Sequence, residues 1–533
     1  MKKINKYGAG LVLLLASTSL MTGCIDETFP TSGVTQEQIK NSTTASENLV
    51  VALPAYLNKK YFSTRYDFDY GYGSLMHIRD IQTADFLRQF SNYDQYWTWA
   101  ENRGMGKQYT YSAFQWGWQT KMVNQANNLL AAVDSVGATD EEKAYRGVAY
   151  AFRALMYLDM AREYEFLPND ETKAQSPDGK DITNLTVPIT TESTTEDQAQ
   201  NNPRATREQM AKFILSDLQQ AEKLIPNLSG TAFNSEKVLP HLDAVYGLYA
   251  RYYMWLENYP MAEKYAAMAI KASSVGPMSE SDALNVTSGF NDPSKWMWAS
   301  TVSKEAIESN LANWVSFASN ETSFGYAGGG GCYTEIDAAM YNRISDTDWR
   351  KLEWKAPDGS ALSGKNSYID ANMGSQLPAY ASLKFRPGGG NTTTYSVAAV
   401  TSYPLMRVEE MYFIQAEAAA HQDAARGKQL LEEFMKTYRD PQYTTDATST
   451  EDVVEEIVFQ KRVELWGEGQ SFFDIKRLNI PIKRNYDGTN HDQTEAFNTT
   501  TRPAWMNWVF PMNTEEEVNA GLKGYNNPDP SYK

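Results

Sequence analysis

The chain has few of the residues from which metal sites and disulfide frameworks are built. Among its 533 residues there are two cysteines and four histidines. Two cysteines are too few for a disulfide framework. The histidines are too scattered to indicate a zinc site: they are His77, His241, His421 and His491. We therefore expect no bound metal and no cofactor.

Signatures of common catalytic sites are also missing. Neither glycine run, Gly328–Gly331 or Gly388–Gly390, is followed by Lys-Ser or Lys-Thr, so the chain has no P-loop. No Gly-x-Ser-x-Gly elbow is present. A glycosidase needs two carboxyls about 5–9 Å apart across a sugar, and closely spaced acids are common in an acidic chain. The sequence predicts a protein that is not an enzyme, although two pairs have suitable spacing: Asp67 with Asp69, and Asp346 with Asp348.

Positive charge is scarce, whereas aromatic residues are plentiful. The formal net charge is −17, which argues against nucleic acid because phosphate contacts need clustered Lys and Arg. It equally disfavours adsorption to anionic lipid, but it does not exclude a neutral ligand such as a sugar. The 13 tryptophans and 33 tyrosines can supply a large core, so the composition is not that of a disordered protein.

The N-terminal residues 1–23 have the features of a signal peptide. Lysines come first, and the apolar run Leu11–Leu15 follows, too short to span a bilayer. The segment Leu20–Cys24 resembles a bacterial lipobox, which predicts cleavage before Cys24 and acylation of its thiol. The alternative is a soluble secreted protein cut near Gly23. Residues 24–47 then form a lipid anchor and polar tether, and Cys332 is left without a cysteine partner.

Residues His241–Ser273 predict a helical hairpin. Apolar and aromatic residues recur at the spacing of one helix face before Asn258, and Pro260 suits the first turn of a second helix. Ala262 and Ala269 lie where a tetratricopeptide-type hairpin needs small residues for close helix approach. An ordinary antiparallel helical hairpin is the alternative interpretation.

Further periodic segments extend this pattern and predict a mainly α fold of stacked hairpins. We expect helical repeats over residues 112–273 and 404–480, and loop-rich elaborations over 62–106 and 275–401, within one domain spanning 48–533. Thr206 and Gln209 fit a capping box. The other helices are expected near residues 48–61, 112–133, 141–165, 206–225 and 408–438.

Two C-terminal segments carry family motifs. Residues 403–418 read YPLMRVEEMYFIQAEA, and residues 457–482 read IVFQKRVELWGEGQSFFDIKRLNIPI. Both resemble signature segments of the SusD/RagB family, the surface nutrient-binding lipoproteins of Bacteroidetes. Gln460 stands where that family often has Glu, and Gln470-Ser471 where it often has His-Arg. Charged residues of these motifs are expected to form structural ion pairs rather than ligand contacts: Arg462, Glu464, Glu468, Asp474 and Arg477.

The resemblance implies a glycan-binding lipoprotein on the outer membrane, facing the cell exterior. Such a protein captures an oligosaccharide or polysaccharide and delivers it to a SusC-like TonB-dependent transporter, which docks on the tetratricopeptide-like face. The segment Ile25-Asp26-Glu27, with its two acidic residues, looks like the surface-export signal of such lipoproteins. Two alternatives remain open: a RagB-like protein that captures peptides, and a glycoside hydrolase.

A sugar site needs exposed aromatic rings beside polar groups, because sugars present apolar C–H faces and a rim of hydroxyls. The best match is residues 96–103, YWTWAENR, where an extended strand would place Trp97 and Trp99 on one face. The resemblance implies that the same site draws on the mid-chain block. The predicted ligand-binding residues are Asp80, Trp97, Trp99, Asn102, Arg103, Trp314 and Tyr326. Burial of each tryptophan is the alternative, and it is expected for Trp296 and Trp298.

Overall fold

The fold is built mainly from helices. The computed structural model describes residues 43–532, apart from 63–65, 90–94, 134, 170, 232, 234, 235, 288, 308 and 310. The predicted signal peptide, Cys24 and most of the predicted tether lie outside the described residues. The longer helices are α3 (Thr43–Tyr56), α4 (Tyr72–Ile81), α6 (Thr110–Ala132), α7 (Asp140–Tyr164), α9 (Arg207–Leu224), α10 (Leu242–Trp255), α11 (Tyr259–Ala272), α17 (Val408–Ala420), α18 (Ala424–Tyr438) and α19 (Thr450–Glu464).

Shorter elements fill the segments between them. The short helices are α5 (Trp97–Glu101), α8 (Glu196–Gln200), α12 (Glu280–Ala283), α13 (Trp314–Ala318), α14 (Ala338–Arg343), α15 (Ala371–Gln376), α16 (Tyr395–Ala398) and α20 (Ser471–Arg477). The strands are β1 (Phe86–Arg88), β2 (Trp298–Thr301), β3 (Thr334–Ile336) and β4 (Ser402–Met406). No helix of the described part is long and apolar enough to cross a membrane.

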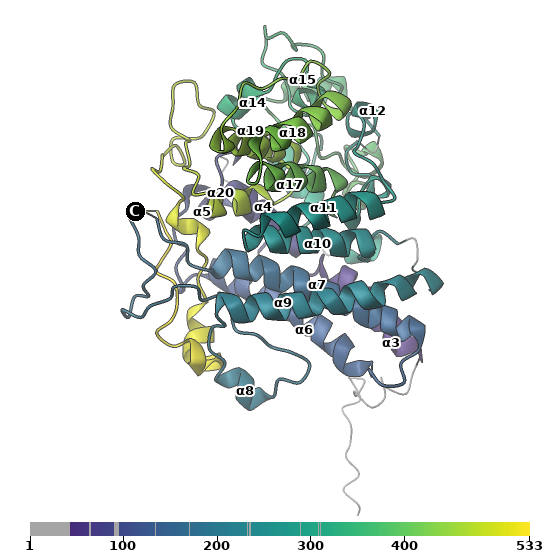
Figure 1. Cartoon of the computed structure of the whole chain (residues 1–533). Helices are drawn as coiled ribbons and strands as arrows, with labels where there is room; N and C mark the ends of the chain where they lie inside the picture. Colours follow the sequence, from purple (N-terminus) through teal and green to yellow (C-terminus); the bar gives the residue numbers. More distant parts are fainter. Residues whose placement is uncertain are drawn as a thin grey trace, which may run out of the picture.

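Antiparallel helical pairs are stacked in sequence order. In Figure 1, α6 and α7 lie in the lower half, α10 and α11 in the middle, and α17 to α19 above them. The helices contact one another along the stack: α7 with α9, α9 with α10, α11 with α17, and α18 with α19. The chain therefore has the predicted tetratricopeptide-like architecture, in which stacking buries a core that one hairpin could not bury alone.

The hairpin of α10 and α11 shows how the sequence specifies these pairs. The Asn258 side chain accepts a hydrogen bond from the Met261 N–H, and Pro260 lies in the first turn of α11, where its missing N–H costs nothing. Ala262 and Ala269 are buried, as predicted. On the other side of α10, a Cβ on Gly247 would lie 2.1 Å from Met406 Sδ, so the absence of a side chain allows this close approach.

Local signals also set the starts of two other helices. The predicted capping box of α9 is present, with Thr206 and Gln209 satisfying each other's backbone N–H groups. Thr139 and Glu142 do the same for α7. The first helix, expected over residues 48–61, begins earlier, at Thr43 within the predicted tether.

Two short antiparallel sheets connect distant parts of the chain. Strand β1 pairs with β3, with Phe86 opposite Ile336, and β2 pairs with β4, with Thr301 opposite Ser402. The first sheet joins the predicted loop region 62–106 to the mid-chain block. The two regions that the sequence names as the ligand side are therefore joined directly.

The prediction that residues 62–106 are irregular is wrong for α4. All ten residues of this helix are buried, including the polar residues His77, Arg79 and Asp80, and such polar composition is what the sequence analysis interpreted as irregular. In contrast, the predicted core positions Trp116, Trp118, Trp296 and Trp298 are buried as expected.

Candidate functional site

Helix α5 sets the directions of the two tryptophans predicted to bind ligand. Residues 97–101 are helical rather than extended, so the prediction that Trp97 and Trp99 share one face is wrong. Two residues in a helix are about 200° apart, and the rings consequently point to opposite sides. Trp97 is 44% exposed, whereas Trp99 is fully buried and offers no ring face to a ligand.

Packing on its inner side explains why α5 is helical. Trp99 contacts the rings of Phe68 and Tyr111 edge-on, with centroids 5.1 and 4.7 Å away. The Tyr96 hydroxyl lies 2.9 Å from Ser74 Oγ on the buried helix α4. Burial of these large rings anchors α5 and leaves only its outer side, with Trp97, in contact with solvent.

The end of α5 separates two further predicted residues. Asn102 adopts a left-handed conformation with φ 51°, is buried, and donates its side-chain N–H to the Ala100 carbonyl. Its side-chain N–H is therefore used in ending the helix, and burial keeps the amide away from a ligand at the surface. The next residue, Arg103, is exposed, with its guanidinium 3.9 Å from Glu101.

Two exposed tyrosines that the sequence analysis missed lie beside this segment. Tyr109, 41% exposed, places its ring 3.5 Å from the position of a Cβ on Gly104. Tyr532, 37% exposed, donates its backbone N–H to the Asn102 carbonyl and stacks on Phe497. Only the second needs tertiary structure to be found, since Tyr109 is six residues from Arg103. We call Trp97, Arg103, Tyr109 and Tyr532 the α5 surface.

The mid-chain candidates are buried beneath this region. Trp314 stacks on Tyr403 with centroids 4.7 Å apart, and a Cβ on Gly73 would lie 2.9 Å from its ring. Tyr326 stacks on Phe317 and donates its hydroxyl to Asp67 at 2.6 Å. Both rings are buried and present no free face to a ligand. Their burial therefore argues against the prediction that they stack on a sugar.

These buried rings nevertheless bring the two predicted regions together. Trp99 contacts Tyr96, Tyr96 contacts Phe317, and Phe317 contacts Tyr326, at centroid distances of 5.4, 5.1 and 4.8 Å. Burial, with the hydrogen bond to Asp67, raises the pKa of Tyr326 well above its ordinary value, so the hydroxyl stays protonated and donates. Trp99 and Tyr326, which the sequence analysis predicted to stack on a ligand, are thus buried rings that pack beneath the exposed side of α5.

Asp80 has a structural contact instead of a ligand-facing one. It is buried, and its Oδ2 accepts the Gly469 N–H at 2.7 Å. Burial raises the pKa of this carboxyl well above its ordinary value, although the Gly469 hydrogen bond opposes the shift. Asp80 therefore ties α4 to the turn before α20, and its assignment to the ligand site is not supported by its position.

The closely spaced carboxylates are also occupied by structural contacts. Asp69 accepts the backbone N–H groups of Tyr61 and Phe62, and Asp67 accepts the Tyr326 hydroxyl. The other pair divides between two cations, Asp346 with Lys351 and Asp348 with Arg350. Within the described ranges, no group of three or more His, Cys, Asp or Glu is placed to hold a metal ion.

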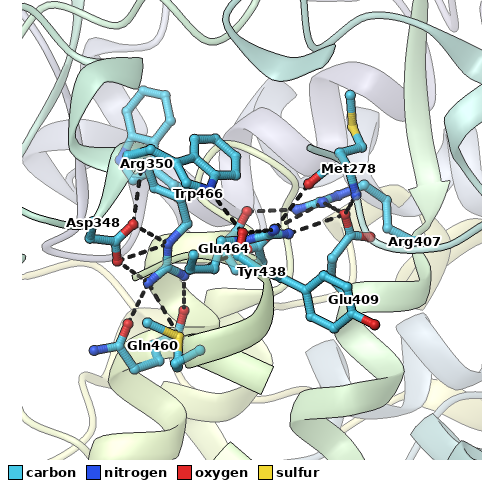
Figure 2. Close-up of polar contacts among 12 residues, drawn as sticks. Met278, Asp348, Arg350, Arg407, Glu409, Tyr438, Gln460, Glu464 and Trp466 are labelled. Atoms are coloured by element: carbon cyan, nitrogen blue, oxygen red, sulfur yellow. Dashed lines mark hydrogen bonds and ion pairs between the residues drawn. The ribbon is translucent and has the colours of Figure 1, made fainter. Parts of the chain in front are cut away.

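Charged residues of the C-terminal motifs form a buried ionic cluster, shown in Figure 2. Glu464 accepts hydrogen bonds from three arginines, Arg350 and Arg407 at 3.1 Å and Arg439 at 2.7 Å. Glu468 pairs with Arg407 and with Lys384, both at distances below 3.0 Å. All of these side chains are buried, which confirms that Glu464 and Glu468 have structural roles.

The cluster also explains the tolerance of one departure from the family motif. Gln460 accepts a hydrogen bond from Arg350 through its side-chain oxygen at 2.5 Å and donates to Glu456. An amide thus makes the contact with Arg350 that a carboxylate could make. The neighbouring motif pairs are present as predicted, with Arg477 on Asp474 and Glu417, and Arg462 on Asp85.

Two family models match separate parts of the chain. One, described as the SusD family, matches residues 325–528. The other, described as starch-binding associating with outer membrane, matches residues 39–254. Together they cover most of the helical repeats but not α11, and they include Trp97, Arg103, Tyr109 and the glutamates of the ionic cluster. No curated protein sequence matches the chain.

Solved structures share the whole fold. A SusD-like carbohydrate-binding protein from Bacteroides vulgatus is 22% identical, with a TM-score of 0.71 over 91% of this chain and 98% of that one. A SusD superfamily protein from Bacteroides thetaiotaomicron is 18% identical, with a TM-score of 0.68 over 93% and 100%. One from Bacteroides fragilis is 18% identical, with a TM-score of 0.64 over 91% and 100%.

Proposed function

The chain belongs to the SusD/RagB family, and on that premise we propose that it is a glycan-binding lipoprotein of the outer membrane. It captures an oligosaccharide or polysaccharide outside the cell and delivers it to a SusC-like TonB-dependent transporter. The protein binds and does not cleave its ligand. Acylation of Cys24 attaches it to the membrane, and the tether places the binding domain beyond the lipid surface.

The α5 surface is the observation that carries this proposal. Trp97 presents an exposed indole ring on helix α5. The buried ring of Trp99 anchors the inner side of this helix, so α5 is held in place while the Trp97 ring stays exposed to solvent. The apolar C–H face of a sugar stacks on such a ring, and Arg103 can donate hydrogen bonds to the hydroxyls beside it. Tyr109 and Tyr532 add two exposed rings from neighbouring backbone.

An indole, two phenols and one guanidinium favour a ligand with alternating apolar faces and hydroxyl groups. No backbone of a sheet edge is exposed in this surface to pair with an extended peptide, because Trp97 and Arg103 belong to or follow a helix. The α5 surface therefore offers no contact that would favour a peptide over a sugar. The binding experiment below includes peptides and would detect peptide capture.

The test measures binding of the purified mature domain to a panel of polysaccharides and peptides. Affinity gels containing starch, other α- and β-glucans, mannans or pectins find the ligand class, and calorimetry gives Kd. We then expect Trp97→Ala to weaken binding at least about tenfold, equivalent to about 1.4 kcal/mol. Tyr395→Ala is the matched control, because Tyr395 is a similarly exposed aromatic residue, at 42%, on a different helix, α16.

Three results would contradict parts of the proposal. Binding of peptides but of no glycan would assign the protein to the peptide-capturing class. Continued release of shorter sugars from a bound glycan would indicate a hydrolase. If Trp97→Ala leaves glycan binding unchanged, the protein still binds glycans but the α5 surface is not the binding site.

A further inference from the structure

A cavity with a charged lining lies between helices of the repeats and of the C-terminal segment. It has a volume of about 40 Å³, is partly open to solvent, and is lined by residues on and next to α7, α10, α17, α19 and α20. A site needs about 10–15 Å³ by this measure to hold one water, so the cavity has room for a larger occupant. It connects the helical repeats to the C-terminal segment that carries the family motifs.

Cations outnumber carboxylates around this cavity. Three carboxylates line it: Glu165, Glu410 and Asp474. Five cations line it: Arg162, Arg251, Lys461, Lys476 and Arg477. Two acids behind the lining also pair with these cations, Asp159 with Arg162 at 2.6 Å and Glu417 with Arg477. Because a buried charge without a partner is expensive, the question is which single cation is left without a carboxylate.

The lining carboxylates already have partners. Glu410 pairs with Arg251 at 2.6 Å, and Asp474 with Lys461 at 2.9 Å and with Arg477. Glu165 lies 3.3 Å from Arg207 and accepts the Trp255 indole N–H. These acids are therefore committed to cations or donors on the cavity wall.

Lys476 is the cation that these pairs leave over. Its Nζ donates to the backbone carbonyl of Glu163 at 2.8 Å, and among the described residues no carboxylate forms an ion pair with it. Burial lowers the pKa of Lys476 to about 7, even though Glu165 and Glu163 act in the opposite direction. A negative charge in the cavity would restore the charged form of this amine.

Arg251 supplies a free donor at the same place. Its Nε and Nη2 bind Glu410 at 2.7 and 2.6 Å, and Nη2 also donates to the Leu405 carbonyl. Its Nη1 is buried and has no hydrogen-bond partner within the described ranges. A buried guanidinium N–H without an acceptor needs an explanation, and an occupant of the cavity provides one.

We propose that this cavity binds a small monatomic anion such as chloride, held between the free Nη1 of Arg251 and the ammonium group of Lys476. The ion compensates the charge of the Lys476 ammonium group and accepts the N–H of Arg251 that has no other acceptor. It can enter past Arg162 and Arg477, whose side chains keep 11% and 15% exposure at the rim. The bound ion then links α10 to α20, and through them the repeats to the C-terminal segment.

The experiment uses bromide, which replaces chloride and scatters anomalously. Crystals of the mature domain grown or soaked in sodium bromide should show an anomalous peak in the cavity, within hydrogen-bond distance of Arg251 and Lys476. In parallel, Tm should rise by about 1 °C for each tenfold increase in chloride above its Kd, with gluconate holding the ionic strength constant.

Matched variants separate this site from general salt effects. Lys476→Met keeps the length of the side chain and removes the charge, so it should abolish the chloride dependence of Tm. Lys212→Met removes a charge from an exposed ion pair on α9 and should leave that dependence unchanged. If Lys476→Met does not fold, the bromide peak in the unaltered protein decides the question.

Three outcomes would overturn the proposal. The first is a cavity without a bromide peak, filled by water alone. The second is a peak at crystal concentration combined with a Tm that responds equally to chloride and gluconate. The third is a chloride dependence that Lys476→Met and Lys212→Met retain to the same extent.

Discussion

Removal of one negative charge from the buried ionic cluster should be among the most damaging single changes in this protein. Glu464 accepts hydrogen bonds from Arg350, Arg407 and Arg439, and all four side chains are buried (Figure 2). Glu464→Gln keeps the shape of the side chain but leaves these guanidinium groups with one carboxylate fewer. The cost of breaking such a buried pair is about 3–5 kcal/mol of unfolding free energy.

The pH dependence of this loss has a definite sign. Burial alone would raise the pKa of Glu464, but Arg439, Arg407 and Arg350 outweigh it and hold that pKa well below 4.5. A carboxylate with a lowered folded pKa stabilises fully above its unfolded pKa and loses the contribution as pH falls through the folded value. The difference between the two proteins should therefore stay constant from pH 7 to about 5 and narrow only in stronger acid.

Calorimetric unfolding of both proteins across this pH range tests the reasoning. At about 2.1 cal/mol/K per residue, the expected loss lowers Tm by roughly 3–5 °C at pH 7. Glu208→Gln is the control, because Glu208 forms an exposed pair with Lys212 and should leave Tm unchanged. A Glu464→Gln variant as stable as this control, or a difference that narrows already between pH 7 and 5, would refute the argument.

Four further substitutions test the fold and the anchor. Trp99→Ala should lower the unfolding free energy by about 3–5 kcal/mol, since its ring is fully buried, whereas Trp97→Ala should change it by less than about 0.5 kcal/mol. Gly247→Ala should destabilise by about 1–3 kcal/mol, measured by thermal unfolding, because the new methyl group would lie 2.1 Å from Met406 Sδ. Cys24→Ala should abolish membrane retention without changing Tm, as followed by cell fractionation.

Each of these has a control and a contrary result. Equal losses of Tm in Trp97→Ala and Trp99→Ala would mean that Trp97 is part of the core. Gly276→Ala, where a Cβ meets nothing within 4 Å, should leave Tm unchanged, and a Gly247→Ala variant that behaves likewise would refute the close approach. A Cys24→Ala variant that still fractionates with outer membranes in cells without the transporter would exclude the lipid as the anchor.

Helix positions could be predicted where their signals lie close together in the sequence. The capping box of Thr206 and Gln209, the break at Asn258 and Pro260, and the small residue Ala262 all act within one or two turns. The sequence analysis did not predict α4, whose polar residues His77, Arg79 and Asp80 are typical of a loop in composition but are buried in the structure. Prediction failed there because burial on all faces comes from surrounding segments rather than from the helix itself.

The sequence predicts a region for the candidate site, but it could not predict which residues of that region are exposed. The sequence indicates residues 96–103 because tryptophans and polar groups are concentrated there, and Trp97 and Arg103 are indeed exposed. It also assigns Trp99, Asn102 and Asp80 to the same surface, although all three are buried. Composition cannot separate an exposed ring from a supporting ring when both lie in one short helix.

The sequence by itself determined the stacked helical hairpins, the family and the structural role of Glu464, because periodicity, caps and motif spacing are properties of neighbouring residues. Tertiary structure alone decided that Trp97 faces solvent while Trp99 faces Phe68, and that Tyr532 lies beside Asn102. Those contacts join residues up to several hundred positions apart. Which side chains are exposed depends on such long-range contacts, so the exposed residues of the candidate site could be identified only from the folded structure.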